Sequence, residues 1–130
     1  MLSKYSLRTT SKEKFIDITG EVQQTVFKSG IRDGICVVYV PHTTAGVTIN
    51  ENVDPTVRSD ILEGLQRMVP NSGNYQHLEG NSPAHIKASL IGVSIQVPVA
   101  SGKLKLGKWQ GIFFSEFDGP RTREYLVKVL

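Results

Sequence analysis

The sequence lacks the features that would cross-link the chain by disulfides or anchor it in a membrane. Its single cysteine, Cys36, excludes a disulfide within the chain. No apolar run approaches the roughly 20 residues that cross a bilayer, because the longest, Ile35 to Val40, has only the length of a strand. The first five residues lack the apolar segment of a signal peptide. These absences predict a cytoplasmic protein with no membrane partner.

Several catalytic signatures are also missing. The sequence contains no Ser-His-Asp order, no Cys-His pair and no glycine-rich phosphate loop. The formal net charge is +3, but the middle of the chain, 33–102, holds more acidic than basic residues and all three histidines. Nucleic-acid binders instead gather Lys and Arg on one face or in one run. We therefore expect no nucleic-acid partner, and the acidic, histidine-bearing middle favours a cation site.

Hydrophobic periodicity predicts an α+β fold in a single domain over 1–130, with about three helices and a β-rich C-terminal half. The predicted helices cover 19–30, 54–70 and 82–92; the second starts at Asp54-Pro55, a capping carboxylate followed by proline. Continuous β-branched residues make Ile35–Val40 a buried central strand. Further strands are expected near 2–9, 15–18, 46–51, 93–99, 103–106, 109–117 and 124–130.

The histidines are the first candidate for chemistry. Three imidazoles and a water form a known catalytic zinc arrangement, so His42, His77 and His85 predict a metal site if the fold brings them together. Glu79, Asn50, Asn52 and Asp54 would orient the ring N–H groups. The spacing matches no standard metal motif, with 34 residues between His42 and His77 and 7 between His77 and His85. Spacing alone favours three unrelated structural histidines.

A phosphate site is the second candidate. The helix that begins near Ser82 would present free N–H groups, Thr43 and Thr44 offer hydroxyls, and Lys87 and Arg121 carry positive charge. The alternative is that the threonines cap a turn, that Lys87 is solvated and that Arg121 forms a salt bridge within the turn Asp118-Gly-Pro-Arg121. A third candidate is a general base among Glu51, Asp54 and Asp60, although Asp54 is already explained as a helix cap and Asp60 as part of the helix surface.

Several blocks, read in order, resemble the YjbQ-type family of secondary thiamine-phosphate synthases. They are Pro41-His-Thr-Thr-Ala-Gly46, Asn50-Glu-Asn-x-Asp-Pro55, His77-x-Glu-Gly-Asn-x-x-Ala-His-x-Lys87, a C-terminal pattern from Ser94 to Ile112, and Glu116-Phe-Asp-Gly-Pro-Arg121. The match spans nearly the whole chain.

The resemblance implies a homotrimer and a transferase that joins a pyrimidine diphosphate to a thiazole phosphate with release of pyrophosphate. Zinc would bind at His42, His77 and His85, and magnesium would accompany the pyrophosphate. Glu79, Lys87 and Arg121 would be catalytic. Phosphate-binding or supporting residues would be Thr43, Thr44, Asn50, Glu51, Asn52 and Asp54. The substrate would be a phosphorylated small molecule; the alternative is a non-catalytic regulatory module that binds a metal or a phosphometabolite.

Overall fold

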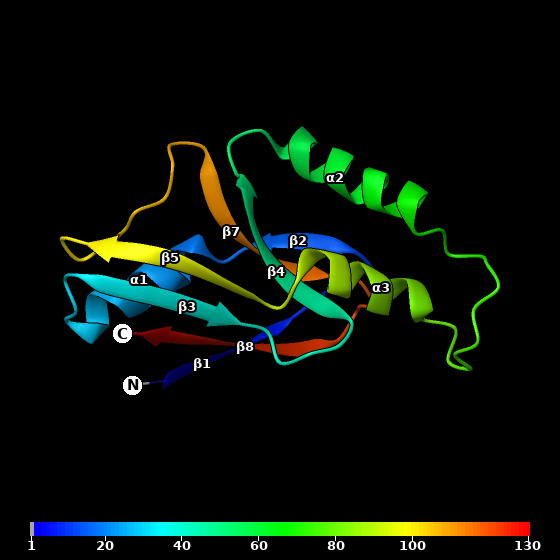
Figure 1. The fold of residues 1–130 in the computed structure, drawn as a ribbon, viewed down its shortest axis with the longest axis horizontal. Helices are drawn as coiled ribbons and strands as arrows, with labels where there is room; N and C mark the ends of the chain where they lie inside the picture. Colours follow the sequence, from blue (N-terminus) through cyan, green and yellow to red (C-terminus); the bar gives the residue numbers. More distant parts are fainter. Residues whose placement is uncertain (1) are drawn as a thin grey trace.

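The computed structural model describes residues 2–130 and contains three helices and eight strands (Figure 1). This confirms the predicted α+β class. The strands are β1 (Leu2–Arg8), β2 (Lys14–Asp17), β3 (Gly34–Tyr39), β4 (Ala45–Glu51), β5 (Ser94–Ala100), β6 (Lys103–Leu104), β7 (Gln110–Glu116) and β8 (Thr122–Val129). The helices are α1 (Thr19–Ser29), α2 (Pro55–Met68) and α3 (Ser82–Ile91).

Two antiparallel sheets form the framework. One has five strands in the order β1-β8-β3-β5-β6, and the other has three in the order β2-β7-β4. The main core lies between them and contains Val38 and Val47 together with Val22 and Val26 of α1. Strand β7 is buried on both faces: Ile112 and Phe114 belong to this core, whereas Phe113 faces a second one.

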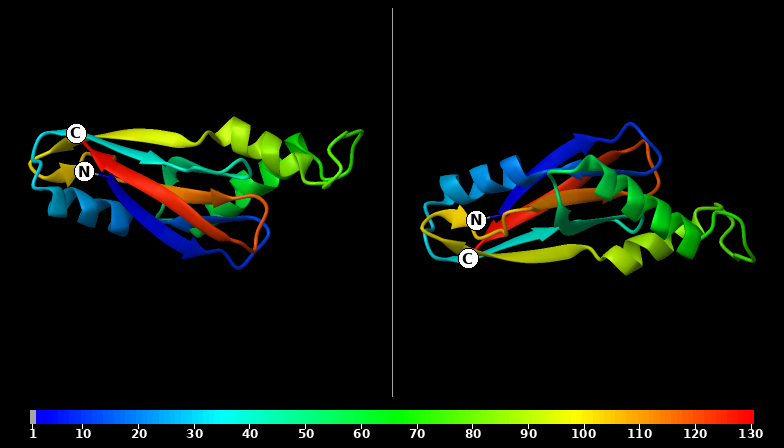
Figure 2. Two further views of the ribbon diagram at one scale, coloured as in Figure 1. Left: turned by 90° about the horizontal axis from the view of Figure 1, so that it is seen from below. Right: turned by 90° about the horizontal axis from the view of Figure 1, so that it is seen from above.

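Helices α2 and α3 cover the outer face of the three-stranded sheet and lie to one side of the molecule (Figures 1 and 2). Leu65 of α2 and Ala84 and Ala88 of α3 pack there against aromatic rings of the sheet and form the second core. The loop that joins the two helices projects beyond the sheets. The result is a layered molecule with helices on one outer face and a bare five-stranded sheet on the other.

The predicted start of α2 is confirmed. Asp54 is its N-cap, and its Oδ1 accepts the N–H of Thr56 at 3.0 Å. The prediction for Ile35–Val40 was only partly right, since β3 lies inside its sheet between β8 and β5 but is buried on one face alone. Ile35 and Tyr39 are each 44% exposed, because no helix covers that side of the sheet.

No helix within residues 2–130 is long and apolar enough to cross a membrane.

Candidate functional site

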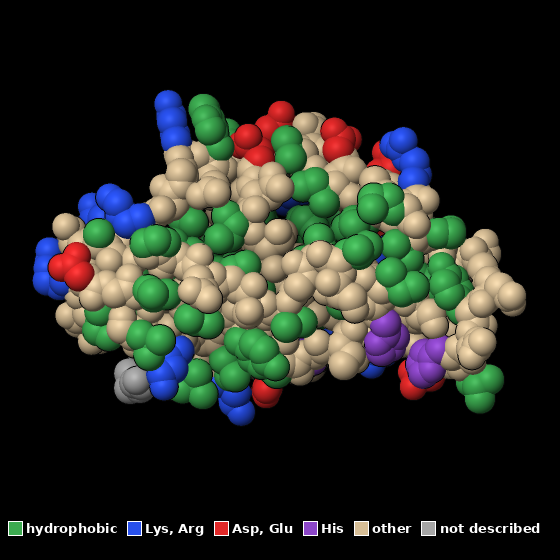
Figure 3. Space-filling view, viewed as in Figure 1, with side chains coloured by type: hydrophobic (Ala, Val, Ile, Leu, Met, Phe, Trp, Pro, Cys, Tyr) green, Lys and Arg blue, Asp and Glu red, His purple; other side chains and the backbone are tan. Residues whose placement is uncertain are grey.

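The three histidines line one open pocket of about 430 Å³. His42 follows β3, His85 lies in the first half of α3, and His77 belongs to the loop before that helix. Histidine side chains lie at the surface at this end of the molecule (Figure 3). The other lining residues are Pro41, Thr43, Thr44, Glu79, Asn81, Arg121 and Arg123. Segments distant in sequence therefore meet here, as the first candidate required.

His42 is fixed by the backbone of β8. Its Nε2 accepts the N–H of Glu124 at 2.9 Å. A backbone N–H is always a donor, so Nε2 must be unprotonated and the proton of the neutral ring lies on Nδ1. Burial, and then the nearby Arg123 guanidinium, lower the pKa of His42 below its ordinary value of 6.5. The ring is therefore a neutral group that donates one hydrogen bond.

His77 and His85 pack against each other. Their ring centroids are 5.4 Å apart and their planes are nearly perpendicular, at 89°. Glu79 lies beside them, with its Oε1 3.9 Å from Nε2 of His77. That distance exceeds the length of a hydrogen bond, and both side chains are well exposed. This half of the pocket is an open rim in contact with solvent.

Two arginines supply the positive charge. Arg121 is half exposed and bound to Asp118, through its Nε to the backbone oxygen at 2.8 Å and its Nη2 to Oδ2 at 2.9 Å. Arg123 is buried, and its Nη2 donates to Oγ1 of Thr44 at 2.9 Å. Its Nε donates to Oε1 of Glu116 at 2.8 Å. These contacts hold both guanidinium groups at the pocket.

Glu116 is the buried counter-charge beneath the site. Burial raises the pKa of its carboxyl, but hydrogen bonds from Arg123, Asp118 and Thr9 outweigh burial and hold the pKa below its usual value. Thr9 links this network to the pocket, because its Oγ1 donates to Glu116 at 2.7 Å and accepts the N–H of Arg121 at 2.9 Å. One buried carboxylate thus positions both arginines.

The predicted zinc centre is wrong. Residues 2–130 contain no group of three His, Cys, Asp or Glu side chains that is arranged to hold a metal ion. The physical reason lies in His42: its Nε2 lone pair is used by the backbone and its Nδ1 carries a proton, so neither nitrogen is free to coordinate. Two imidazoles at the exposed rim do not complete a zinc site.

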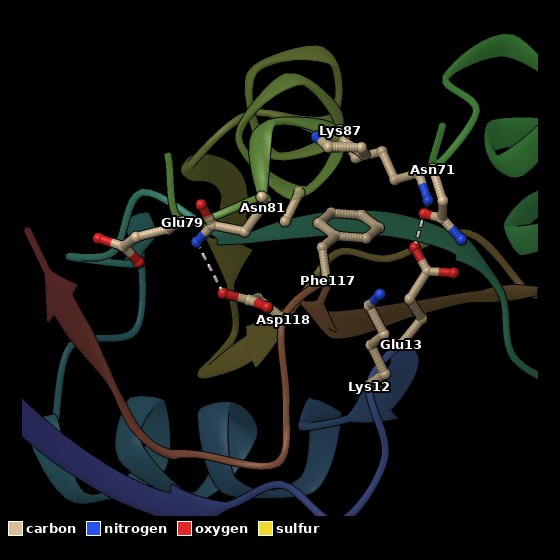
Figure 4. Close-up of a pocket in the computed structure, with 11 residues that line it drawn as sticks. Lys12, Glu13, Asn71, Glu79, Asn81, Lys87, Phe117 and Asp118 are labelled. Carbon is tan, nitrogen blue, oxygen red and sulfur yellow. Dashed lines mark hydrogen bonds and ion pairs between the residues drawn. The ribbon is translucent and has the colours of Figure 1, made fainter. Parts of the chain in front are cut away.

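Lys87 was expected beside Arg121 but lies in a neighbouring pocket of about 230 Å³ (Figure 4). It is 1% exposed and pairs with Glu13, and its Nζ also donates to Oε1 of Gln66 at 3.0 Å. Glu79 and Asn81 line both pockets. The ammonium of Lys87 therefore joins α3 to α2 and to the β1–β2 loop, and does not face the histidines.

The structure does not bring the acidic and amide residues at the C-terminal end of β4 and just after it to the histidines. Thr44 directly precedes β4, whereas Asn50 to Asp54 lie at its other end, roughly 20 Å away for a strand of this length. There Oε2 of Glu51 accepts the N–H of Val53 at 3.1 Å, and Asp54 caps α2. The predicted catalytic roles of Glu79 and Arg121, and the phosphate-binding roles of Thr43 and Thr44, stay predictions.

Two residues of the pocket were missed by the sequence reasoning. Arg123 is one, although extending the alternation of Tyr125, Val127 and Val129 backwards places it on the core face of β8. Asn81 is the other: it precedes α3, and its Nδ2 donates to Oδ2 of Asp118 at 3.0 Å. α3 begins at Ser82 as predicted, and the side chain of Asn81 makes no capping bond, so its contact with Asp118 has no local signal in the sequence.

Comparison with known proteins places this geometry among close relatives. Residues 3–130 match the family model described as UPF0047 protein YjbQ-like. UPF0047 protein MJ1081 of Methanocaldococcus jannaschii is 53% identical over 130 residues, covering 100% of this chain and 94% of that protein. UPF0047 protein YugU of Bacillus subtilis is 47% identical, with 100% and 99% covered.

Solved structures of related proteins have the same fold. An uncharacterized conserved protein of the YjbQ/UPF0047 family from Clostridium acetobutylicum superposes with a TM-score of 0.97 at 57% identity, covering 98% of this chain and 99% of that one. A YbjQ-like protein of unknown function from Sulfolobus solfataricus gives 0.96 at 36% identity, with 99% and 95% covered.

These comparisons correct the predicted activity. The family model and the relatives are described by a family name, and the Sulfolobus solfataricus protein by unknown function, so a thiamine-phosphate synthase-like transferase is not supported and that prediction is wrong. The geometry agrees, because Lys87 does not join Arg121 to clamp a pyrophosphate. What the match over residues 3–130 establishes is that the chain belongs to the UPF0047 YjbQ-like family.

Proposed function

We propose that the histidine pocket binds a small anion, and that the natural ligand is a phosphorylated small molecule. The observation that carries this proposal is the polarity of its fixed groups. His42 has only Nδ1–H to offer, and Arg121 and Arg123 are cations. Donors and positive charge held in place before a ligand arrives are the complement of a phosphate.

Arg121 is the residue that would contact the phosphate directly. A guanidinium has five N–H donors, and the two contacts with Asp118 use one on Nε and one on Nη2. Three donors remain on a side chain that is half exposed to the pocket. Thr43 and Thr44, which also line the pocket, add hydroxyls. Arg123 would attract the phosphate by its positive charge without touching it, since its Nε and Nη2 donors are already bound to Glu116 and Thr44.

The test is calorimetric titration with inorganic phosphate and with glycerol 3-phosphate, using glycerol as the uncharged control. We expect both anions to bind, glycerol not to bind, and Arg121→Gln to weaken binding about tenfold or more, the value of a charge-assisted hydrogen bond. Lys105→Gln removes one exposed positive charge outside the pocket and is expected to bind like the wild type. Absence of phosphate binding, or equal weakening by the two substitutions, contradicts the proposal.

We propose that a divalent metal binds at this pocket only when a phosphate ligand is bound as well. Magnesium is commonly held by one or two carboxylates and the oxygens of a bound phosphate, and Glu79 places one exposed carboxylate at the rim. We expect pyrophosphate to bind more tightly with magnesium than with EDTA, and Glu79→Gln to abolish that difference. An equal affinity in the two buffers contradicts this part.

We also propose that the protein is a homotrimer, as the family resemblance implies. What supports self-association is the bare face of the five-stranded sheet, where Ile35, Tyr39 and Leu126 point away from the core. Light scattering is expected to give three times the mass of one chain. Tyr39→Glu should reduce that mass to one chain, whereas Phe27→Glu, at an aromatic residue 80% exposed on α1, should not. A monomeric or dimeric wild type contradicts the proposal.

The cytoplasm is the proposed compartment. The single, buried and unpaired Cys36 fits a reducing environment, and fractionation of cells with a tagged chain tests it.

A further inference from the structure

A second basic groove, which shares no residue with the histidine pocket, runs along β2. It has a volume of about 420 Å³ and is lined by all four residues of that strand, Lys14–Asp17. Arg8 and Thr10 contribute from the end of β1 and the residues after it, and Arg58 from α2. A cavity that touches every residue of a strand in turn follows the edge of that strand.

The edge of β2 is open. Among the described residues, 2–130, this strand is the last in its sheet and pairs with β7 alone. The N–H of Ile18 donates to the oxygen of Ile112 at 2.9 Å, so in the antiparallel register the backbone groups of Ile16 also face β7. The N–H and C=O groups of Phe15 and Asp17 then face the groove. Unpaired strand edges of this kind are templates for an added strand.

The groove is positively charged. Arg8, Lys14 and Arg58 form no ion pair within residues 2–130. Arg58 lies over the ring of Phe113, with Cζ 5.2 Å from the centroid. A guanidinium stacked in this way keeps its in-plane N–H donors available. Asp17 is the one acid in the lining, and its Oδ1 accepts from the N–H and hydroxyl of Thr19.

The cations lie on both sides of the strand. Phe15 and Phe113 belong to the second core, so Arg58 lies on the helix side of the sheet. Lys14 points to the opposite side, because successive side chains of a strand alternate. Successive residues of a strand added at this edge would alternate in the same way, so each would meet a cation. This arrangement favours consecutive acidic residues over isolated ones.

We propose that the edge of β2 is a docking site for an acidic segment of another protein, which adds as an extended strand of about four residues and places Asp or Glu side chains against Arg8, Lys14 and Arg58. Backbone pairing with Phe15 and Asp17 fixes the segment, and the three cations select its charge. The proposal is independent of the anion in the histidine pocket.

The probe is a fluorescein-labelled, end-capped peptide of eight residues with four consecutive glutamates between pairs of threonines, titrated by fluorescence anisotropy. We expect saturable binding that weakens about tenfold or more in the double variant Lys14→Gln/Arg58→Gln. Arg67→Gln is the matched control, because it removes an exposed charge of the same helix whose one ion pair within residues 2–130 is with Glu63. It should bind the peptide like the wild type.

Two further peptides separate strand addition from simple charge attraction. Glutamine in place of the glutamates should abolish binding, and N-methylation of alternate backbone amides, which leaves the charge intact, should weaken it about tenfold or more. The proposal is overturned if the acidic peptide does not bind, if the N-methylated peptide binds equally well, or if an eight-nucleotide DNA strand binds more tightly. It is also overturned if Lys14→Gln/Arg58→Gln changes the oligomeric state, which would make the occupant a second copy.

Discussion

Replacing Glu116 by glutamine removes the only carboxylate that the structure places against the buried guanidinium of Arg123. Glu116 is 0% exposed and Arg123 4% exposed, so solvent cannot take over the lost interaction. Breaking such a buried pair from one side costs about 3–5 kcal/mol. For a urea slope of about 2 kcal/mol per molar, the unfolding midpoint falls by about 1.5–2.5 M.

The measurement is urea unfolding followed by circular dichroism. Glu124→Gln is the control, because its ion pair with Lys4 spans 3.7 Å between exposed side chains and is worth less than about 1 kcal/mol. The double variant Glu116→Leu/Arg123→Met removes both buried charges and should recover much of the loss. Equal losses for Glu116→Gln and Glu124→Gln, or a double variant less stable than Glu116→Gln, would refute the reasoning.

Three further predictions follow from the contacts of the site. A lowered pKa means that the unfolded chain protonates His42 first, so the free energy of unfolding should fall as pH drops below about 6.5; His42→Gln should flatten that part of a pH series of urea midpoints. A Cβ on Gly46 would lie 2.3 Å from the backbone oxygen of Gly92, so Gly46→Ala should cost about 1–3 kcal/mol in thermal unfolding. Lys87→Met should cost about 1–3 kcal/mol, because Glu13 loses its donor, and should leave the affinity for phosphate unchanged in calorimetry; weaker phosphate binding would return Lys87 to the site.

Local rules were enough to predict most of the fold. Asp54-Pro55 is a helix start whatever surrounds it, because the cap and the fixed φ of proline act within one turn. Alternation likewise marks the strands of the five-stranded sheet, since only one face of that sheet packs on the core. These signals cannot tell whether a helix covers the other face, so the exposure of Ile35 and Tyr39 on β3 could not be predicted.

The site was harder to predict because it depends on which ends of the elements meet. Asn50 was predicted to orient the ring N–H group of a histidine, yet β4 carries it to the far end of the sheet. Lys87 shows a different failure. It lies in the buried stripe of α3 with Ala84 and Ala88, and helical periodicity alone would have turned it inward. A lysine in such a stripe was assigned to chemistry when its position indicated packing.

The bond between His42 and the backbone of Glu124 makes this ring a natural spectroscopic reporter. Because one ring nitrogen is locked as an acceptor, the two ¹⁵N resonances of the imidazole should be widely separated, in the pattern of the Nδ1–H tautomer. A ligand that accepts the Nδ1 proton would shift that resonance, whereas a ligand that protonates the ring would bring the two resonances together and break the hydrogen bond from the N–H of Glu124 to the ring. The same spectrum therefore reports both whether a ligand occupies the pocket and whether the hydrogen bond between His42 and β8 is intact.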